Sequence, residues 1–335
     1  MWAPRHPFFE HACACAWLAW RDGQAVGRIS AQVDGLHAAA GFDDIGQFGQ
    51  LESVDDAAVF EALLQTAGDW LTTKGKTVLQ GPFDLSINQQ CGLLVDGYSV
   101  PSMMMMPYNP PFYSKRLEQL GFESAVELLA YRGTPDYQTP TTVSRLLKRM
   151  GKRLRIETVK RADLSAQADR MREIFNDAWS QNWGFVPLTE SEFKHMVSEM
   201  KMLVRPGYVH LAWLDEQPAG FIVALPDLNE LTAGLDGRLL PFGGLRLLWR
   251  IWRKRNRGAR IPLMGIVRRH HQSLAGAAVS YALFEAARGP LIADGVELCE
   301  QSWILEQNQG MRAMLESIGM QVAQRFRIYQ KPLPA

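Results

Sequence analysis

Residues 296–331 read VELCEQSWILEQNQGMRAMLESIGMQVAQRFRIYQK, and this stretch decides the fold. The apolar run around Leu298 and Ile304 predicts a buried strand, and Asn308 stands where it can cap a following helix. One face of that helix is apolar, since its apolar residues recur at i, i+3, i+4 and i+7: Met311, Met314, Leu315 and Ile318. Gly319 is expected to end the helix, and residues 322–329 to form a last strand.

A sequence repeat divides the chain. AWRDGQAVGRISA at 19–31 and AWLDEQPAGFIVA at 212–224 share seven of thirteen residues, and each predicts a β-hairpin. A second match follows at nearly the same offset: Leu117, Glu118, Gly121 and Tyr131 correspond to Leu315, Glu316, Gly319 and Tyr329. Two matches in the same order predict two copies of one α/β (α+β) domain.

The repeat also predicts the domain boundaries. The N-terminal copy is expected over 1–135, a linker over 136–153 and the C-terminal copy over 154–335. The second hairpin is preceded by a strand and two helical patterns, for which the first hairpin has no counterpart. Either the chain is shortened at its N-terminus, or the first copy has lost its front part.

Charge and cysteine content restrict the function classes. Net charge is +1, yet residues 237–284 hold ten basic residues and no acidic one. The four cysteines lack the spacing of a zinc site or a disulfide framework: Cys13, Cys15, Cys91 and Cys299. No apolar run has transmembrane length. We therefore expect a reduced cytoplasmic protein that holds no metal.

The order of strand, Asn-capped helix, glycine and strand resembles the last third of a GNAT-superfamily acyltransferase domain. With the repeat, the whole chain is similar to a tandem-GNAT protein whose N-terminal copy is degenerate. The resemblance implies two mixed, mostly antiparallel sheets flanked by helices. It also implies a strand that splays from its neighbour, with acyl-CoA threaded through the gap as a co-substrate and no permanently bound cofactor.

A GNAT domain binds the CoA pyrophosphate on N–H groups at a helix N-terminus, where the helix dipole favours an anion. The segment GIVRRHHQSLAGAAV at 265–279 fits the family loop in part, with Ala275 in place of its first glycine. The resemblance assigns donor binding to Ile266, Val267, Arg268, Arg269, Gln272, Gly276, Ala277 and Asn308. Arg268, Arg269, His270 and His271 supply anion contacts, or these four residues form only a solvated basic turn. The first copy is acidic at the matching place, LESVDDAAVF at 51–60, and is not expected to bind CoA.

Amine acylation needs a group that accepts the ammonium proton. Glu300 is the favoured catalytic residue, because a charge inside a buried strand is unusual; Glu306 and Asp227 are the other candidates. Aromatic and amide side chains can line a substrate slot, which predicts a substrate-binding role for Asn182, Trp183 and Trp303. Packing between helices is the alternative for these side chains.

Residues 245–257 predict an amphipathic helix. Its apolar side carries Leu245, Leu248, Trp249 and Trp252, and its basic side carries Arg246, Arg250, Arg253, Lys254 and Arg257, with Arg255 off the pattern. Two tryptophans opposite a basic face are typical of a helix in an anionic membrane interface. A core-packed helix and a nucleic-acid contact are the alternatives, and no DNA-binding motif accompanies the segment.

Three function classes follow. The first is an N-acyltransferase that uses acyl-CoA or acyl carrier protein and a small-molecule or lipid amine, such as a sphingoid base. The second is an aminoacyl-tRNA-dependent transferase resembling the tandem-GNAT peptidoglycan enzymes. The third is a non-catalytic binding protein. For the first class we expect a cytoplasmic protein, peripheral on the inner face of the membrane.

Overall fold

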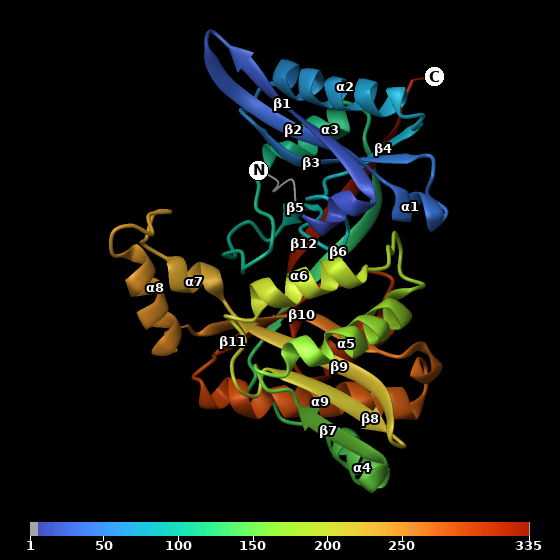
Figure 1. Cartoon of the computed structure of the whole chain (residues 1–335), viewed down its shortest axis with the longest axis vertical. Coiled ribbons are helices and arrows are strands. Elements are labelled where there is room, and N and C mark those ends of the chain that lie inside the picture. The colour runs from blue at the N-terminus through green and yellow to red at the C-terminus, as the bar shows by residue number, and fades with distance from the viewer. Residues whose placement is uncertain (1–5, 255, 335) are drawn as a thin grey trace.

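The computed structural model describes residues 6–254 and 256–334 (Figure 1). Both predicted hairpins are present: β1 (Ala12–Arg21) with β2 (Gln24–Asp34), and β8 (Val209–Leu214) with β9 (Gln217–Pro226). Their registers match, because Ala19 pairs with Gly27 as Ala212 pairs with Gly220, and an irregularity follows in both. Both turns use positive φ at both central residues, Asp22 and Gly23 or Asp215 and Glu216, which suits the twist of a two-residue hairpin.

The strands form one 12-stranded sheet in the order β1-β2-β3-β4-β12-β6-β11-β10-β9-β8-β7, with β5 beside β12. The remaining strands are β3 (Ile45–Ser53), β4 (Val78–Gly81), β5 (Leu93–Asp96), β6 (Glu123–Gly133), β7 (Leu154–Thr158), β10 (Gly258–Ile266), β11 (Leu298–Leu305) and β12 (Gln321–Pro332). The pairs β3–β4 and β10–β11 are parallel, and the other pairs are antiparallel. Each repeat therefore contributes a mixed, mostly antiparallel half.

The two halves exchange their closing strands. β12, which closes the second repeat, pairs with β4 of the first, and β6, which closes the first repeat, pairs with β11 of the second. β6 and β12 pair antiparallel with each other at the centre of the sheet. Each half is thus completed by a strand from the other repeat.

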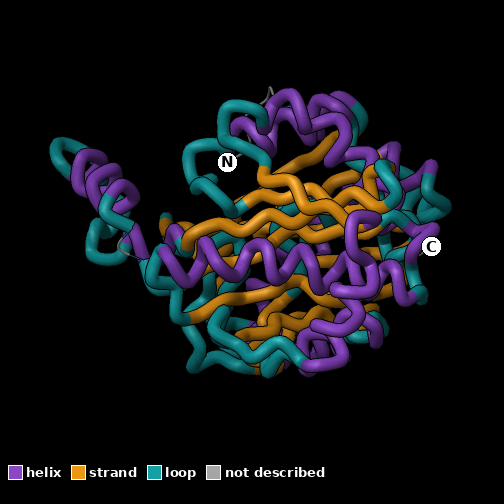
Figure 2. The backbone as a smooth tube through the Cα atoms, turned by 90° about the horizontal axis from the view of Figure 1, so that it is seen from below, coloured by secondary structure: helices purple, strands orange, loops and turns teal. Residues whose placement is uncertain are grey.

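Helices cover both faces of the sheet (Figure 2). They are α1 (Gly35–Ala39), α2 (Ala57–Thr73), α3 (Phe112–Gln119), α4 (Thr141–Met150), α5 (Leu164–Trp179), α6 (Glu190–Met200), α7 (Leu228–Thr232), α8 (Gly243–Trp252), α9 (Leu274–Ala293) and α10 (Gln309–Ser317). Along β9, Ile222 and Ala224 join the core under α9, whereas Phe221 and Val223 join the core under α5 and α6. This alternation is expected of a strand buried on both faces.

The closing stretch forms as predicted. Asn308 caps α10, its Oδ1 accepting from the Met311 N–H at 3.1 Å, and Gly319 follows the helix at φ +83°. Within the predicted linker, α4 packs against α9. β7, α5 and α6 precede the second hairpin, while among the described residues only the 3-10 helix Pro7–Glu10 precedes the first.

Candidate active site

β10 and β11 separate partway along their length. They pair over four positions, of which the last joins Ile261 to Gln301. β10 then continues against β9 to Ile266, and β11 against β6 to Leu305; no pair joins β10 to β11 in this part of the described sheet. The splay expected between these strands is therefore present.

A cavity of about 750 Å³ occupies the opening. Its walls come from the end of β10, the start of α9, the start of α10 and the end of α5. Of the predicted donor-binding residues, those that line it are Ile266, Gln272, Gly276, Ala277 and Asn308. Val267 is buried but does not line the cavity. The exposed Arg268 and Arg269 do not line it either.

The N-terminus of α9 forms one wall. Ser273 caps the helix: its Oγ accepts from the Gly276 N–H at 3.0 Å and donates to the His270 carbonyl at 2.7 Å. Gly276 lies so close to this turn that a Cβ there would come within 2.0 Å of the His270 oxygen. The close approach brings the positive end of a 20-residue helix to the cavity, where it favours an anion.

The basic turn before α9 divides into two parts. Arg268 and Arg269 do not line the cavity: the Arg268 N–H donates to Asp177 at 2.6 Å, and the Arg269 guanidinium donates to the Pro218 carbonyl at 3.0 Å. His270 and His271 do line it. Burial and the neighbouring Arg269 lower the pKa of His270, so this imidazole is neutral at pH 7.

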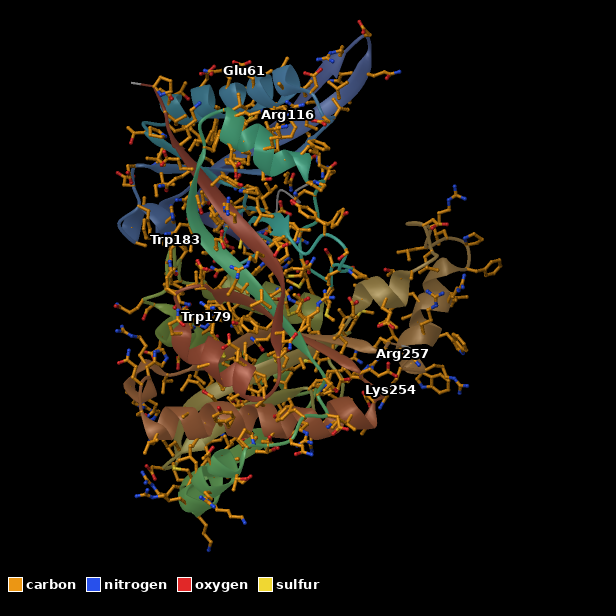
Figure 3. All side chains as sticks on the ribbon, turned by 180° about the vertical axis from the view of Figure 1, so that it is seen from behind. Glu61, Arg116, Trp179, Trp183, Lys254 and Arg257 are labelled. Carbon is orange, nitrogen blue, oxygen red and sulfur yellow. The ribbon has the colours of Figure 1, made fainter. Side chains whose placement is uncertain are left out.

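A smaller cavity of about 140 Å³ lies beside the first and is lined largely by apolar side chains. The two share the lining residues Trp179, Asn182, Trp183, Met264, Leu305, Asn308 and Met311. Figure 3 shows Trp179 and Trp183 in the same part of the molecule. All three predicted substrate-binding residues, Asn182, Trp183 and Trp303, line the smaller cavity.

The first repeat supplies one wall of this smaller cavity. Ile87, Cys91 and Met105 line it together with the α6 residues Met196 and Met200. Burial raises the pKa of the Cys91 thiol to about 12, so it stays protonated. Sequence reasoning missed this wall, because loop residues of the first repeat come next to the cavity of the second only in the folded chain.

Glu300 is fully buried and engaged by arginines from both repeats. Its Oε2 accepts from Arg132 Nε at 2.8 Å, and its Oε1 accepts from Ser302 Oγ at 2.7 Å and lies 3.8 Å from Arg260 Nε. Arg260, also buried, donates to Ser302 and to the Met104 carbonyl and lies over the Trp303 ring. Glu300 lines neither cavity. These contacts support a structural ion-pair role, and its catalytic role stays a prediction.

The other two predicted carboxylates lie apart. Asp227 caps α7 and accepts from the Met104 N–H at 3.1 Å; burial raises the pKa of its carboxyl. Glu306 is half-buried, 3.5 Å from Arg325, and directly follows the lining residue Leu305. The structure therefore does not bring the three carboxylates together at the cavities.

The equivalent place in the first repeat is built differently. Gly49 of β3 lies so close to Phe83 that a Cβ would come within 1.7 Å of the Phe83 oxygen, and the Phe83 N–H donates to the Phe48 carbonyl at 2.8 Å. At the start of α2, Asp56 accepts from the Ala58 N–H. A carboxylate of the chain itself thus occupies the helix N-terminus where an anion would bind.

The α7–α8 hairpin projects from the body of the molecule (Figures 1 and 2). α8 has no buried residue; Trp252 is 74% exposed and Leu240, before the helix, 87%. The other exposed large apolar side chains here are Leu239, Phe242, Leu245, Leu248 and Trp249. Core packing of this face, one of the alternatives above, is therefore wrong for the described residues. Arg255 lies outside the described residues.

Two basic residues hold this hairpin rather than face solvent freely. Arg250 donates to the carbonyls of Leu231 and Ala233 at 2.8 and 2.7 Å, and Lys254 pairs with the buried carboxylate of Asp294. Lys254 and Arg257 stand at its base (Figure 3). Among the described residues, no helix combines the length and hydropathy needed to cross a bilayer.

Comparisons with known proteins extend to nearly the whole chain. It is 39% identical over 333 residues to the bacterial ceramide synthase of Caulobacter vibrioides, a match that covers 98% of this chain and 86% of that protein. It is 40% identical over 330 residues to Protein YghO of Escherichia coli, covering 98% and 85%. No family model matches the sequence.

Among solved structures, a tandem GNAT protein from the clavulanic acid biosynthesis pathway has a TM-score of 0.54 at 13% identity, covering 99% of this chain and 85% of that one. A GCN5-related N-acetyltransferase from Sphaerobacter thermophilus has a TM-score of 0.53 at 12% identity, covering 94% and 79%. The fold is therefore that of tandem GNAT proteins, as predicted.

Proposed function

This chain belongs to the family of GNAT-type acyltransferases that includes the bacterial ceramide synthase of Caulobacter vibrioides, and we propose that it transfers an acyl group from acyl-CoA to a lipidic amine. The observation that carries the proposal is the pair of joined cavities where β10 and β11 separate. The second repeat, 154–335, is the proposed catalytic part. The first, 1–135, is the proposed non-catalytic part.

The donor fits the larger cavity. The pyrophosphate would bind at the N-terminus of α9, near Gln272, Gly276 and Ala277, and the pantetheine would run along Ile266 toward Asn308. Of the four residues predicted to contact the anion, His270 and His271 line this end of the cavity, and Arg268 and Arg269 do not. In the first repeat, the Asp56 carboxylate occupies the N-terminus of α2 and therefore disfavours the binding of an anion there.

We assign the start of the acyl chain to the smaller cavity, and the acceptor amine to the place where it joins the larger one. The apolar lining of the smaller cavity, formed by α5, α6 and the wall from the first repeat, suits a hydrocarbon chain better than a polar acyl group. The amine nitrogen attacks the thioester carbonyl carbon there; the C–S bond breaks, and the CoA thiolate leaves and takes up a proton. Of the predicted carboxylates, we assign the proton removed from nitrogen to Glu306, because this residue adjoins the shared wall.

A lipidic acceptor is supported by the projecting hairpin. It joins the sheet at Gly258, the start of β10, whereas the anion-binding turn follows Ile266 at the other end of this nine-residue strand. At about 3.3 Å per residue over eight steps, the two ends of this strand lie about 26 Å apart. We propose that the exposed side chains of α8 enter an anionic membrane surface, so that a lipid amine approaches from the end opposite the CoA pyrophosphate.

The test is acyl transfer by the purified protein with a long-chain acyl-CoA and a sphingoid base, followed by thiol release and by mass spectrometry of the amide. If only acyl carrier protein serves as the acyl donor, the proposed donor is wrong, but the proposed acyl transfer to an amine still holds. Transfer that requires aminoacyl-tRNA, or ligand binding without any transfer, would overturn the proposal. Activity that survives Gly276→Val would also contradict the assigned cleft.

A further inference from the structure

Helix α4, which lies between the two repeats, carries a stripe of positive charge. Its apolar side packs on the core under α9, where Met150 is buried and Leu146 and Leu147 lie against the core. The opposite side and the 3-10 helix that follows, Gly151–Arg153, carry exposed basic residues at i, i+3, i+4 and i+7: Arg145, Lys148, Arg149 and Lys152. Among the described residues, no carboxylate forms a salt bridge with any of these four.

This stripe leads toward the larger cavity. Arg153, the residue after its last member, donates to the Asp215 carboxylate at 2.8 and 2.7 Å, which fixes the end of the stripe to the β8–β9 turn. The same hairpin accepts a hydrogen bond from the Arg269 guanidinium at the Pro218 carbonyl. His270, the next residue, lines the cavity. The tip of one hairpin therefore contacts both the stripe and the anion-binding turn.

Two further cations lie beside the cavity. Arg268 and Arg269 are exposed and outside the cavity lining. The acidic residues of the hairpin turn, Asp215 and Glu216, form salt bridges with other arginines, Arg153 and Arg155, and so leave the exposed cations in excess. We call these exposed cations the donor-side basic surface: Arg145, Lys148, Arg149, Lys152, Arg268 and Arg269.

The place of the donor-side basic surface restricts its partner. Figure 1 shows α4 and the projecting α8 on different sides of the molecule, so a membrane that receives α8 lies away from α4. Free CoA is too small a partner, because its pyrophosphate is placed at the N-terminus of α9 and the stripe continues over a separate helix. Cations that extend beyond a ligand cavity suit an acidic macromolecule, because complementary charge steers its approach.

The cavities distinguish between two such macromolecules. Acyl carrier protein and aminoacyl-tRNA are both polyanions that present an activated acyl group. The smaller cavity is lined largely by apolar side chains, among them Met196 and Met200, which suit a hydrocarbon chain and not the charged amino group of an aminoacyl ester. We propose that the donor-side basic surface docks an acidic acyl carrier protein, whose acylated phosphopantetheine arm enters the larger cavity. The proposal rests on the acyltransferase function above and adds a partner on its donor side.

The chemical step stays the same with this donor. The amine nitrogen attacks the thioester carbonyl carbon at the end of the arm and gives up its proton to the base assigned above. The C–S bond breaks, the thiolate takes up a proton, and the carrier protein leaves with a free thiol.

The experiment compares palmitoyl-CoA with palmitoyl acyl carrier protein as donors for one long-chain amine. The variant combines Arg145→Gln, Lys148→Gln and Arg149→Gln, since none of these residues lines either cavity. For the carrier-protein donor, kcat/KM is expected to fall about tenfold or more in this variant. Added salt is expected to lower the same value in the unchanged protein, because salt screens exposed charges.

The value of kcat/KM for palmitoyl-CoA is expected to stay within about twofold of that of the unchanged protein. A matched control removes three exposed cations that lie outside the donor-side basic surface: Lys115→Gln, Lys160→Gln and Arg161→Gln. This control is expected to use both donors as the unchanged protein does.

If palmitoyl-CoA is used and palmitoyl acyl carrier protein is not, the inference is overturned and the acyltransferase proposal stands. An equal loss for both donors in the triple variant also overturns it, because the cations then serve free CoA. If neither donor is used, fluorescence anisotropy of labelled holo-acyl carrier protein at low salt decides. Binding that the triple variant loses and the control keeps supports the docking surface; no binding, or tighter binding of tRNA, refutes it.

Discussion

The guanidinium of Arg132, on the closing strand of the first repeat, lies 2.7 Å from the carboxylate of Glu300, on β11 of the second. Glu300 is fully buried and the Arg132 side chain is 10% exposed. One ion pair therefore joins the repeats at the point where their strands are exchanged. Breaking a buried pair by removing one partner leaves the other charge without compensation.

Glu300→Gln is therefore expected to lower the free energy of unfolding by about 3 kcal/mol, since Arg132 and Arg260 would lose their shared carboxylate. Urea unfolding measures this loss, and Glu297→Gln, at an exposed surface pair, is the control. If Glu300 is instead the proton acceptor predicted from the sequence, turnover falls about a hundredfold with little loss of stability.

Gly276→Ala is expected to weaken CoA binding by about tenfold or more. The new Cβ would meet the His270 carbonyl, so the turn that forms the anion site must move. Isothermal titration with CoA measures the effect. Gly289→Ala, in the same helix and with open space around its Cβ, is the control. Equal affinities of the two variants would contradict the assigned pyrophosphate site.

Trp249→Ala combined with Trp252→Ala is expected to reduce binding to anionic vesicles at every salt concentration. Removing each large side chain is expected to weaken the free energy of binding by about 2 kcal/mol if that side chain was fully buried in the interface. Arg246→Gln with Arg253→Gln is expected to act mainly at low salt, at about 1 kcal/mol per charge. Flotation with vesicles of phosphatidylglycerol and phosphatidylcholine measures both pairs.

Arg250 is kept unchanged in that experiment, because it holds the hairpin through two carbonyls. If the unchanged protein does not float with the vesicles even at low salt, the proposal that α8 binds a membrane is wrong. Acyl transfer to a detergent-solubilised amine should continue in either case, because the cavities lie in the body of the protein.

The stability of the protein is expected to fall as the pH drops below about 6.5, partly through His210. Burial lowers the pKa of this histidine from its ordinary value of 6.5, so the unfolded chain binds the proton more readily than the folded one. The contribution of the neutral ring is full above 6.5 and is lost as the pH falls toward the folded pKa. Urea unfolding at pH 7.5 and 5.5 measures the change in the free energy of unfolding between the two pH values. This change should be smaller for His210→Gln than for the unchanged protein.

The elements that could be predicted from sequence depend on neighbours in the chain. The hairpin turn at Asp22 and Gly23 requires only positive φ at two residues, and the Asn308 cap reaches an N–H three residues away. The splay of β10 from β11 followed from the family resemblance. The lining of the cavity was anticipated at Gly276 and Ala277 for the same reason, and at Trp183 because aromatic and amide side chains can line a substrate slot.

What could not be predicted depends on pairs distant in sequence. Arg132 and Glu300 are 168 residues apart, and the sequence around either residue does not predict its partner. The charge of Glu300 in a buried strand was a real signal, but burial in a catalytic site and burial in an ion pair give the same signal in sequence. Arg268 failed to reach the cavity because Asp177, on α5, holds the turn.

The exchange of closing strands sets the order in which the molecule can be finished on the ribosome. Residues 321–332, synthesised after the other strands of both repeats, form the strand that lies against β4 of the first repeat. Until these residues have been synthesised, the edge of β4 that pairs with β12 has no partner strand, even though the rest of the first repeat is already complete. A truncation that removes β12 therefore leaves the first repeat as incomplete as the second, and the two repeats are expected to fold together as one cooperative unit.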